Sequence, residues 1–165
     1  MIYQWLVFAH ILAVFGFLLA HGSATAVAFR LRNEREVERI RALLDLSRGA
    51  SAVGNASLLA LLAFGVAAGF VGDWWGRYWI WTALGLLIVI SIAMTLVGSG
   101  PLIRIRQLVG ATGPSRAKPA VQPRAGADID EKLAALQATV HPVLLTVIGG
   151  GGLAVILWLM LFKPF

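Results

Sequence analysis

Three histidines and two internal methionines are the side chains of this chain that combine ligand chemistry with apolar surroundings. His10 and His21 lie in one uncharged stretch, residues 3–29, and His141 lies in the last apolar stretch. An imidazole can ligate haem iron or copper, and it can also pass protons near neutral pH. Met94 and Met160 add thioether sulfur, which suits copper(I). The sequence therefore directs attention to cofactor or metal binding within apolar segments.

The spacing of His10 and His21 places both imidazoles on one face of a helix. Eleven steps of about 100° make three turns plus about 20°, and they separate the two rings by about 16 Å along the axis. Ionisable side chains within membrane spans usually face the interior of a bundle. We therefore expect this face of the first helix to look toward other helices.

The elements that must position these residues are long apolar helices. Residues 3–29 exceed the roughly 20 residues that cross a hydrocarbon core, and they lack the charged region and cleavage site of a signal peptide. The chain is 59% hydrophobic and 13% charged, far from the roughly 25% charged residues of soluble domains. The sequence predicts an all-α membrane protein of one domain, a bundle of four transmembrane helices at about 3–29, 50–71, 78–97 and 133–162.

The basic residues predict the orientation of the bundle. Of the fourteen Lys and Arg residues, only Arg77 and Lys163 lie outside the two long loops. The positive-inside rule then puts both loops in the cytoplasm and both termini outside. All six tryptophans fall at span ends that this orientation places outside, as expected of an interfacial aromatic belt.

The sequence also predicts the structure of the segments that connect the spans. The spacing of Val37, Ile40 and Leu44 predicts an amphipathic helix within residues 30–46 that lies at the cytoplasmic interface. Residues 101–127 are rich in Gly and Pro and predict a flexible cytoplasmic linker. Pro142 removes a backbone donor and predicts a bend in the last helix.

Several ligand chemistries stay open for the histidines. His21 and His141 lie at similar expected depths and would serve as axial ligands of a b-type haem, with space left by the glycines at 149–152. Close contact with another helix is the other explanation for those glycines. His10 would form a separate outer site with Met160, and copper could use His with Met94 or Met160. Proton relay is a further alternative, as is simple hydrogen bonding of each histidine to a neighbouring helix.

The residue patterns of several function classes are missing from the sequence. It contains no cysteine, no phosphate-binding loop, no paired carboxylates within a span and no Ser-His-Asp set. The net charge of +6 follows from the basic loops, and no nucleic-acid-binding motif organises it. The leading hypothesis is a non-enzymatic membrane protein, an accessory or assembly subunit, whose partners are the lipid bilayer and either another membrane protein or further copies of the chain.

Two segments carry a resemblance to a family. The first span with its arginine-rich continuation, AHILAVFGFLLAHGSATAVAFRLRNERE, and the entry to the third span, DWWGRYWIWTALG, resemble an uncharacterised bacterial family of small integral membrane proteins. That family is distantly similar to the copper-resistance protein D type, whose members have histidines within their helices. The resemblance implies a multi-pass protein of the bacterial inner membrane, with His10 and His21 as the matching positions.

Overall fold

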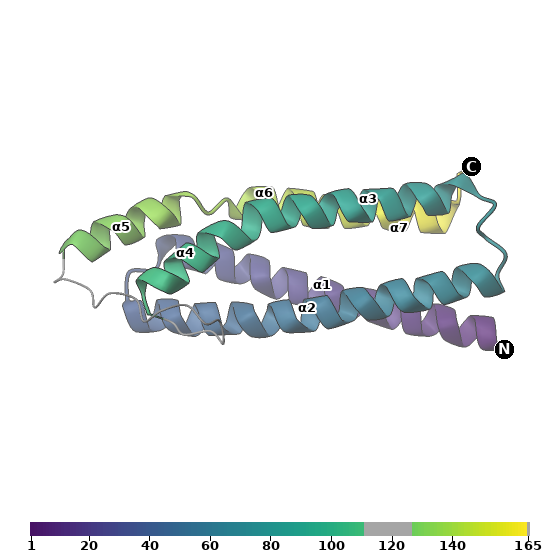
Figure 1. The fold of residues 1–165 in the computed structure, drawn as a ribbon, viewed down its shortest axis with the longest axis horizontal. Helices are drawn as coiled ribbons and strands as arrows, with labels where there is room; N and C mark the ends of the chain where they lie inside the picture. Colours follow the sequence, from purple (N-terminus) through teal and green to yellow (C-terminus); the bar gives the residue numbers. More distant parts are fainter. Residues whose placement is uncertain (111–126, 165) are drawn as a thin grey trace.

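The computed structural model of the chain is an all-α bundle that describes residues 1–110 and 127–164, without the side chains of 127–130 (Figure 1). Within this part of the chain, four helices are long and apolar enough to cross a membrane, which confirms the predicted bundle. The N terminus, the C terminus and the turn at 72–77 lie at one end, which we call the tryptophan end. The opposite end carries the turn at 34–36, and we call it the arginine end.

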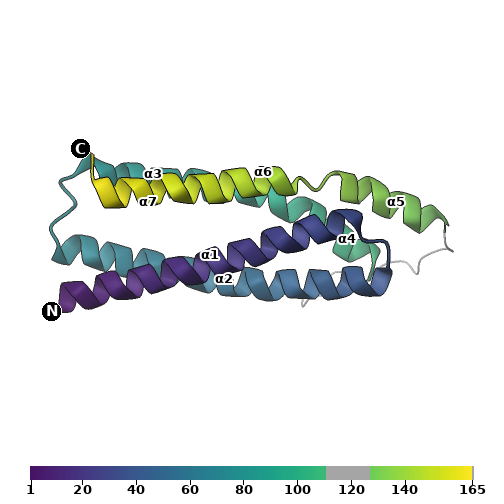
Figure 2. The same ribbon diagram turned by 180° about the vertical axis from the view of Figure 1, so that it is seen from behind.

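The first two spans form a long antiparallel hairpin of α1 (Ile2–Asn33) and α2 (Val37–Val71) (Figures 1 and 2). Small residues let the two backbones approach closely. A Cβ atom on Gly16 would come within 2.7 Å of the Ser57 hydroxyl, and a Cβ on Gly54 would also touch α1. Small residues of α1 and α2 thus form a packing surface between the two helices.

The turn between α1 and α2 is built around Glu34. Its Oε1 accepts hydrogen bonds from the backbone N–H groups of Glu36 (3.2 Å) and Arg35 (3.0 Å). These bonds, first of all the one from Glu36, lower the pKa of the Glu34 carboxyl because they stabilise its charged form. The prediction of a separate helix at 30–46 is corrected: this segment contains the end of α1 at Asn33, the turn and the start of α2 at Val37, and each of the two helices is continuous with a span.

The third span is longer than its apolar stretch. Helix α3 (Tyr78–Met94) passes through a π-helical turn, η1 (Thr95–Ser99), into α4 (Gly100–Leu108). Ile105 of α4 is fully buried against the hairpin. This corrects the predicted linker for residues 101–108, which are helical because their aliphatic side chains pack into the core. The later part of that linker, 111–126, lies outside the described residues.

The last span is broken near its start. Three residues separate helix α5 (Ala127–Ala138) from α6 (Pro142–Thr146). Helix α6 continues through a π-helical turn, η2 (Val147–Gly151), into α7 (Gly152–Phe162). Proline has no backbone N–H and disfavours a helical conformation in the preceding residue. The break therefore confirms the bend predicted at Pro142.

Two clusters of buried side chains hold the helices together at different levels. The cluster near the arginine end joins α1, α2, α4 and α5, and its members Leu31, Ile40, Leu44 and Ile105 are fully buried. The second cluster lies within the spans and joins α2, α3 and α7. Its buried members are Leu61, Ala83, Leu87, Ile90, Ile156 and Leu159.

Gln137 attaches α5 to the end of α1. Its side chain is buried, and its Nε2 donates to the backbone oxygens of Leu31 (2.8 Å) and Glu34 (2.7 Å). The last carbonyl groups of a helix have no partner within the helix, so this side chain satisfies acceptors that α1 would otherwise leave open. Arg41 acts similarly between α2 and α4, because its Nε donates to the Val109 oxygen at 2.9 Å.

Candidate functional site

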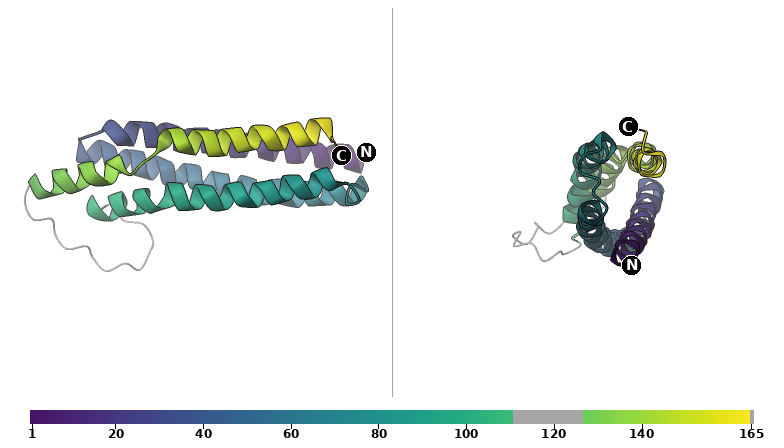
Figure 3. Two further views of the ribbon diagram at one scale, coloured as in Figure 1. Left: turned by 90° about the horizontal axis from the view of Figure 1, so that it is seen from above. Right: turned by 90° about the vertical axis from the view of Figure 1, so that its right-hand side faces the viewer.

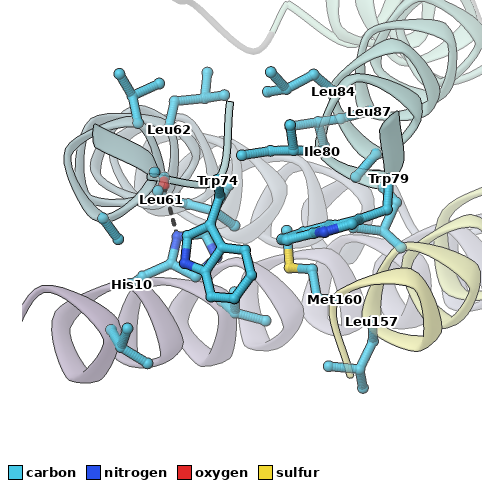
Figure 4. A pocket seen from close by; sticks show the side chains of 18 of the residues that line it. His10, Leu61, Leu62, Trp74, Trp79, Ile80, Leu84, Leu87, Leu157 and Met160 are labelled. Atoms are coloured by element: carbon cyan, nitrogen blue, oxygen red, sulfur yellow. Dashed lines mark hydrogen bonds between the residues drawn. The ribbon is translucent and has the colours of Figure 1, made fainter. Parts of the chain in front are cut away.

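An apolar cavity of about 460 Å³ lies between the α1–α2 hairpin and the paired helices α3 and α7. Viewed along the bundle, the four helices stand around a common centre (Figure 3). The cavity is partly open, and its lining residues place it in the half of the bundle nearer the tryptophan end. Figure 4 shows side chains that line it. Each span contributes aliphatic or aromatic side chains to its wall, among them Val7, Leu62, Leu84 and Leu157.

His10 is a polar group in this wall with a fixed orientation. Its Nδ1 lies 2.8 Å from the backbone oxygen of Leu61 on α2, and a carbonyl oxygen only accepts, so Nδ1 carries the proton. In the neutral ring, Nε2 is then a free acceptor or ligand atom. The ring reaches α2 because position 65 is glycine, where a Cβ would come within 3.0 Å of it. The prediction that His10 faces other helices is thus confirmed.

A lysine and two tryptophans form the end of the cavity nearest the termini. The Lys163 Nζ lies 4.0 Å from the ring centroid of Trp74 and 5.9 Å from that of Trp79. The face of an indole ring attracts a cation, so these rings hold the ammonium at the cavity. The Trp74 Nε1 in turn donates to the Tyr3 hydroxyl of α1 at 3.2 Å. This contact links the turn at 72–77 to the first helix.

Two other indole N–H groups beside the cavity have no acceptor among the described residues. Trp79 is 7% exposed, and its buried Nε1 makes no hydrogen bond; the same holds for the Nε1 of Trp75. Both residues line the cavity. Buried donors in folded proteins nearly always have a partner, and leaving one unpaired costs about 1–3 kcal/mol. The wall of the cavity therefore contains two unpaired, buried donors.

Relatives do not identify this site. Comparisons with protein-family models, curated proteins and solved structures find no match to this chain. The resemblance to the copper-resistance protein D type stays a prediction, and the site is defined by its geometry alone.

The structure places His21 and His141 apart from this cavity. The His21 ring lies against Gly149 of η2, where a Cβ would overlap it, so this histidine also faces another helix, as predicted. His141 is exposed and lines a separate groove with Arg32. Neither histidine is part of the central wall. The haem-ligand hypothesis for this pair stays a prediction.

The glycines at 149–152 support close helix contact. A Cβ on Gly149 would overlap the His21 ring, and one on Gly152 would overlap Ile90 of α3. Side chains of two neighbouring helices thus occupy the space that these glycines leave. Of the two explanations for the glycine run, contact with another helix is the one that these positions favour.

The two candidate sulfur ligands have different surroundings. Met94 packs against both buried clusters and fills space between them. Met160 lines the cavity that also contains His10, and its side chain lies beside the Trp79 ring (Figure 4). Within the described residues, no group of three or more His, Cys, Asp or Glu side chains could hold a metal ion.

Sequence reasoning missed Lys163, Trp79 and Trp75 as site residues. It explained the tryptophans as a belt at the membrane interface and used Lys163 only to assign orientation. Lys163 follows Trp79 by 84 residues, so no spacing within one helix connects it with the two tryptophans. Their positions at one end of the spans were the only available signal.

Proposed function

We propose that the protein is a non-enzymatic multi-pass membrane protein that holds one lipid-soluble molecule in the cavity between its two helix pairs. The observation that carries the proposal is the cavity of about 460 Å³ with walls from all four spans. Pockets for small ligands are typically about 300–1,000 Å³, mostly apolar, with a few placed polar groups. His10 and Lys163 are such groups here.

Selectivity in such a cavity has to come from shape and from polar contacts. Lipid tails are as apolar as leucine, so transfer of a chain from the bilayer into an apolar wall gains little from the hydrophobic effect. The described wall offers packing surface together with a small number of donors. As an accessory or assembly subunit of a membrane complex, the protein would act by holding this molecule.

The test is a comparison of two tryptophan substitutions on α7. Ala154 lines the cavity, whereas the next residue, Val155, is 49% exposed and is not part of its wall. We expect native mass spectrometry of purified protein to show one retained molecule per chain in the wild type and in Val155→Trp. Ala154→Trp should lose it, because the indole fills the cavity. Equal occupancy in all three proteins would refute the proposal.

A second candidate function is haem binding, and it is favoured by the fixed tautomer of His10. Ligating histidines usually donate their other N–H to a carbonyl or carboxylate, as Nδ1 of His10 does to Leu61. A Soret band that disappears in His10→Ala and persists in His21→Ala would place the haem in the cavity. The reverse result would support His21 and His141. Protein that stays colourless after haem addition would exclude both.

Copper binding can be tested on the same samples. His10 and Met160 line one cavity, and imidazole with thioether sulfur is a ligand combination for copper. If copper binds there, metal analysis should find it in the wild type and find less in Met160→Leu. Met94→Leu is the matched control, since Met94 packs between the buried clusters instead.

A further inference from the structure

We propose that the molecule held in the cavity is a lipid with an anionic headgroup. Its headgroup would bind Lys163, and its acyl chain would fill the apolar part of the cavity. This inference rests on the proposed function and specifies the ligand class of the same site.

The charge of the cavity wall supports an anionic ligand. Lys163 is the one charged side chain in the described wall, which contains no carboxylate. Asp73 belongs to the nearby turn but does not line the cavity, and Lys163 makes no ion pair with a described acidic residue. The Trp74 ring holds the ammonium in place without neutralising it. Among the described residues no carboxylate neutralises the cation, so an anionic headgroup would supply its counter-charge.

The hydrogen-bonding groups at this end of the cavity also favour an anionic ligand. An indole N–H only donates, and so does a lysine ammonium. The Lys163 ammonium thus makes this end of the cavity a donor site, in a wall that also contains the buried, unpaired Nε1 atoms of Trp79 and Trp75. A phosphate or carboxylate brings several acceptor oxygens and no obligatory donor. A ligand whose headgroup mainly donates would leave the Lys163 ammonium unpaired.

The depth of these groups matches the dimensions of a lipid. Lys163 follows α7 directly, and Trp79 is in the first turn of α3, so both lie at the tryptophan end where headgroups are expected. The cavity continues along α1 from Tyr3 past His10 to Leu18. At about 1.5 Å per residue, this stretch covers roughly 22 Å, which is enough for most of an acyl chain. A headgroup at Lys163 would therefore have its chain directed into the cavity.

The experiment compares two lipids that share their acyl chains. Delipidated protein in a neutral detergent is titrated with phosphatidylglycerol or with phosphatidylcholine, and bound lipid is counted by native mass spectrometry. We expect the wild type to bind one phosphatidylglycerol, with a Kd at least about tenfold lower than for phosphatidylcholine. The reason is that hydrogen bonds from the charged Lys163 ammonium to the anionic headgroup are among the stronger ones. Lys163→Gln should remove this preference, and Lys163→Arg should keep it. Arg77→Gln is the matched control, since Arg77 is exposed at the same end but does not line the cavity.

The outcomes separate this inference from the proposed function. If both lipids bind equally at a site that Ala154→Trp blocks, the cavity binds lipid but the anionic preference is refuted. Preference that is lost in Arg77→Gln and kept in Lys163→Gln also refutes it. If neither lipid binds at a site blocked by Ala154→Trp, the proposed function itself fails for lipids. A different molecule that stays bound through purification and is not displaced by phosphatidylglycerol, such as haem, would overturn the inference as well.

Discussion

Gln137 is the side chain that attaches the broken last span to the first helix. Its two hydrogen bonds reach backbone oxygens at the end of α1, and its surroundings are buried. Gln137→Leu keeps the volume but leaves the oxygens of Leu31 and Glu34 without this donor. We expect a loss of about 1–3 kcal/mol in the free energy of unfolding, measured by denaturant titration in detergent.

The control for Gln137 is another glutamine near the arginine end. Gln107 lies on α4 and is exposed, so Gln107→Leu should change stability by no more than about 0.5 kcal/mol. Equal losses in the two variants would show that the hydrogen bonds of Gln137 are not the cause.

Gly149 is required by the ring that lies against it. A Cβ at this position would overlap His21, so we expect Gly149→Ala to cost about 1–3 kcal/mol, as overpacking usually does. The combined variant His21→Ala with Gly149→Ala should recover much of this loss, because the overlap is then removed. Thermal unfolding of the three proteins measures the effect.

Gly151 provides the comparison within the same turn of helix. Nothing lies within 4 Å of a Cβ built there, so Gly151→Ala should be neutral or stabilise the protein by about 0.5–1 kcal/mol. A destabilisation as large as that of Gly149→Ala would contradict the role given to His21.

The Glu34 carboxyl should titrate below its ordinary pKa. Hydrogen bonds from the backbone of Glu36 and Arg35 stabilise its charged form, and that stabilisation exists only in the folded turn. Its contribution to stability is therefore fully present above the ordinary pKa and is lost as the pH falls through the lowered value. Carbon-13 NMR of this carboxyl, compared with a short unstructured peptide of residues 31–39, measures the shift. A titration at or above that of the peptide would contradict it.

At the scale of the elements, sequence predicted the spans better than their connections. Length and apolarity place each span, because a membrane helix must be long and nearly uncharged. The segments at 30–46 and 101–108 were misjudged, since their charges suggested an interface or a linker. Ile40 and Ile105 are nevertheless fully buried in one cluster. That cluster exists only when four helices meet, so no local pattern could reveal it.

For the candidate site, too, the sequence predicted what depends on one helix and missed what depends on contacts between helices. The face shared by His10 and His21 follows from helix geometry, and both rings do face other helices. Their different partners, Leu61 for one and Gly149 for the other, depend on how α1 crosses its neighbours. The meeting of Lys163 with Trp74 depends on the position of a turn 90 residues earlier in the chain, which the sequence does not specify.

At the scale of the whole molecule, the orientation in the membrane is a prediction that chemical labelling can test. The chain has no cysteine, so single cysteines report without background. We expect Arg77→Cys at the tryptophan end to react with a membrane-impermeant maleimide on intact cells. Glu36→Cys at the arginine end should react only after the membrane is permeabilised, because the basic loops favour the cytoplasm. Reaction of Glu36→Cys on intact cells would reverse the orientation.

The length of α2 has a practical consequence. Its apolar part, from Gly49 to Val71, covers about 34 Å and suffices for the hydrocarbon layer, whereas Val37 to Arg48 adds about 18 Å more. With residues 49–71 spanning the hydrocarbon layer, this additional stretch and the end of α1 would extend beyond the acyl chains as a pair of packed helices. A binding protein raised against this helix pair, or a rigid partner fused at the turn 34–36, would add ordered, water-exposed mass that helps to align images of this small protein in electron microscopy.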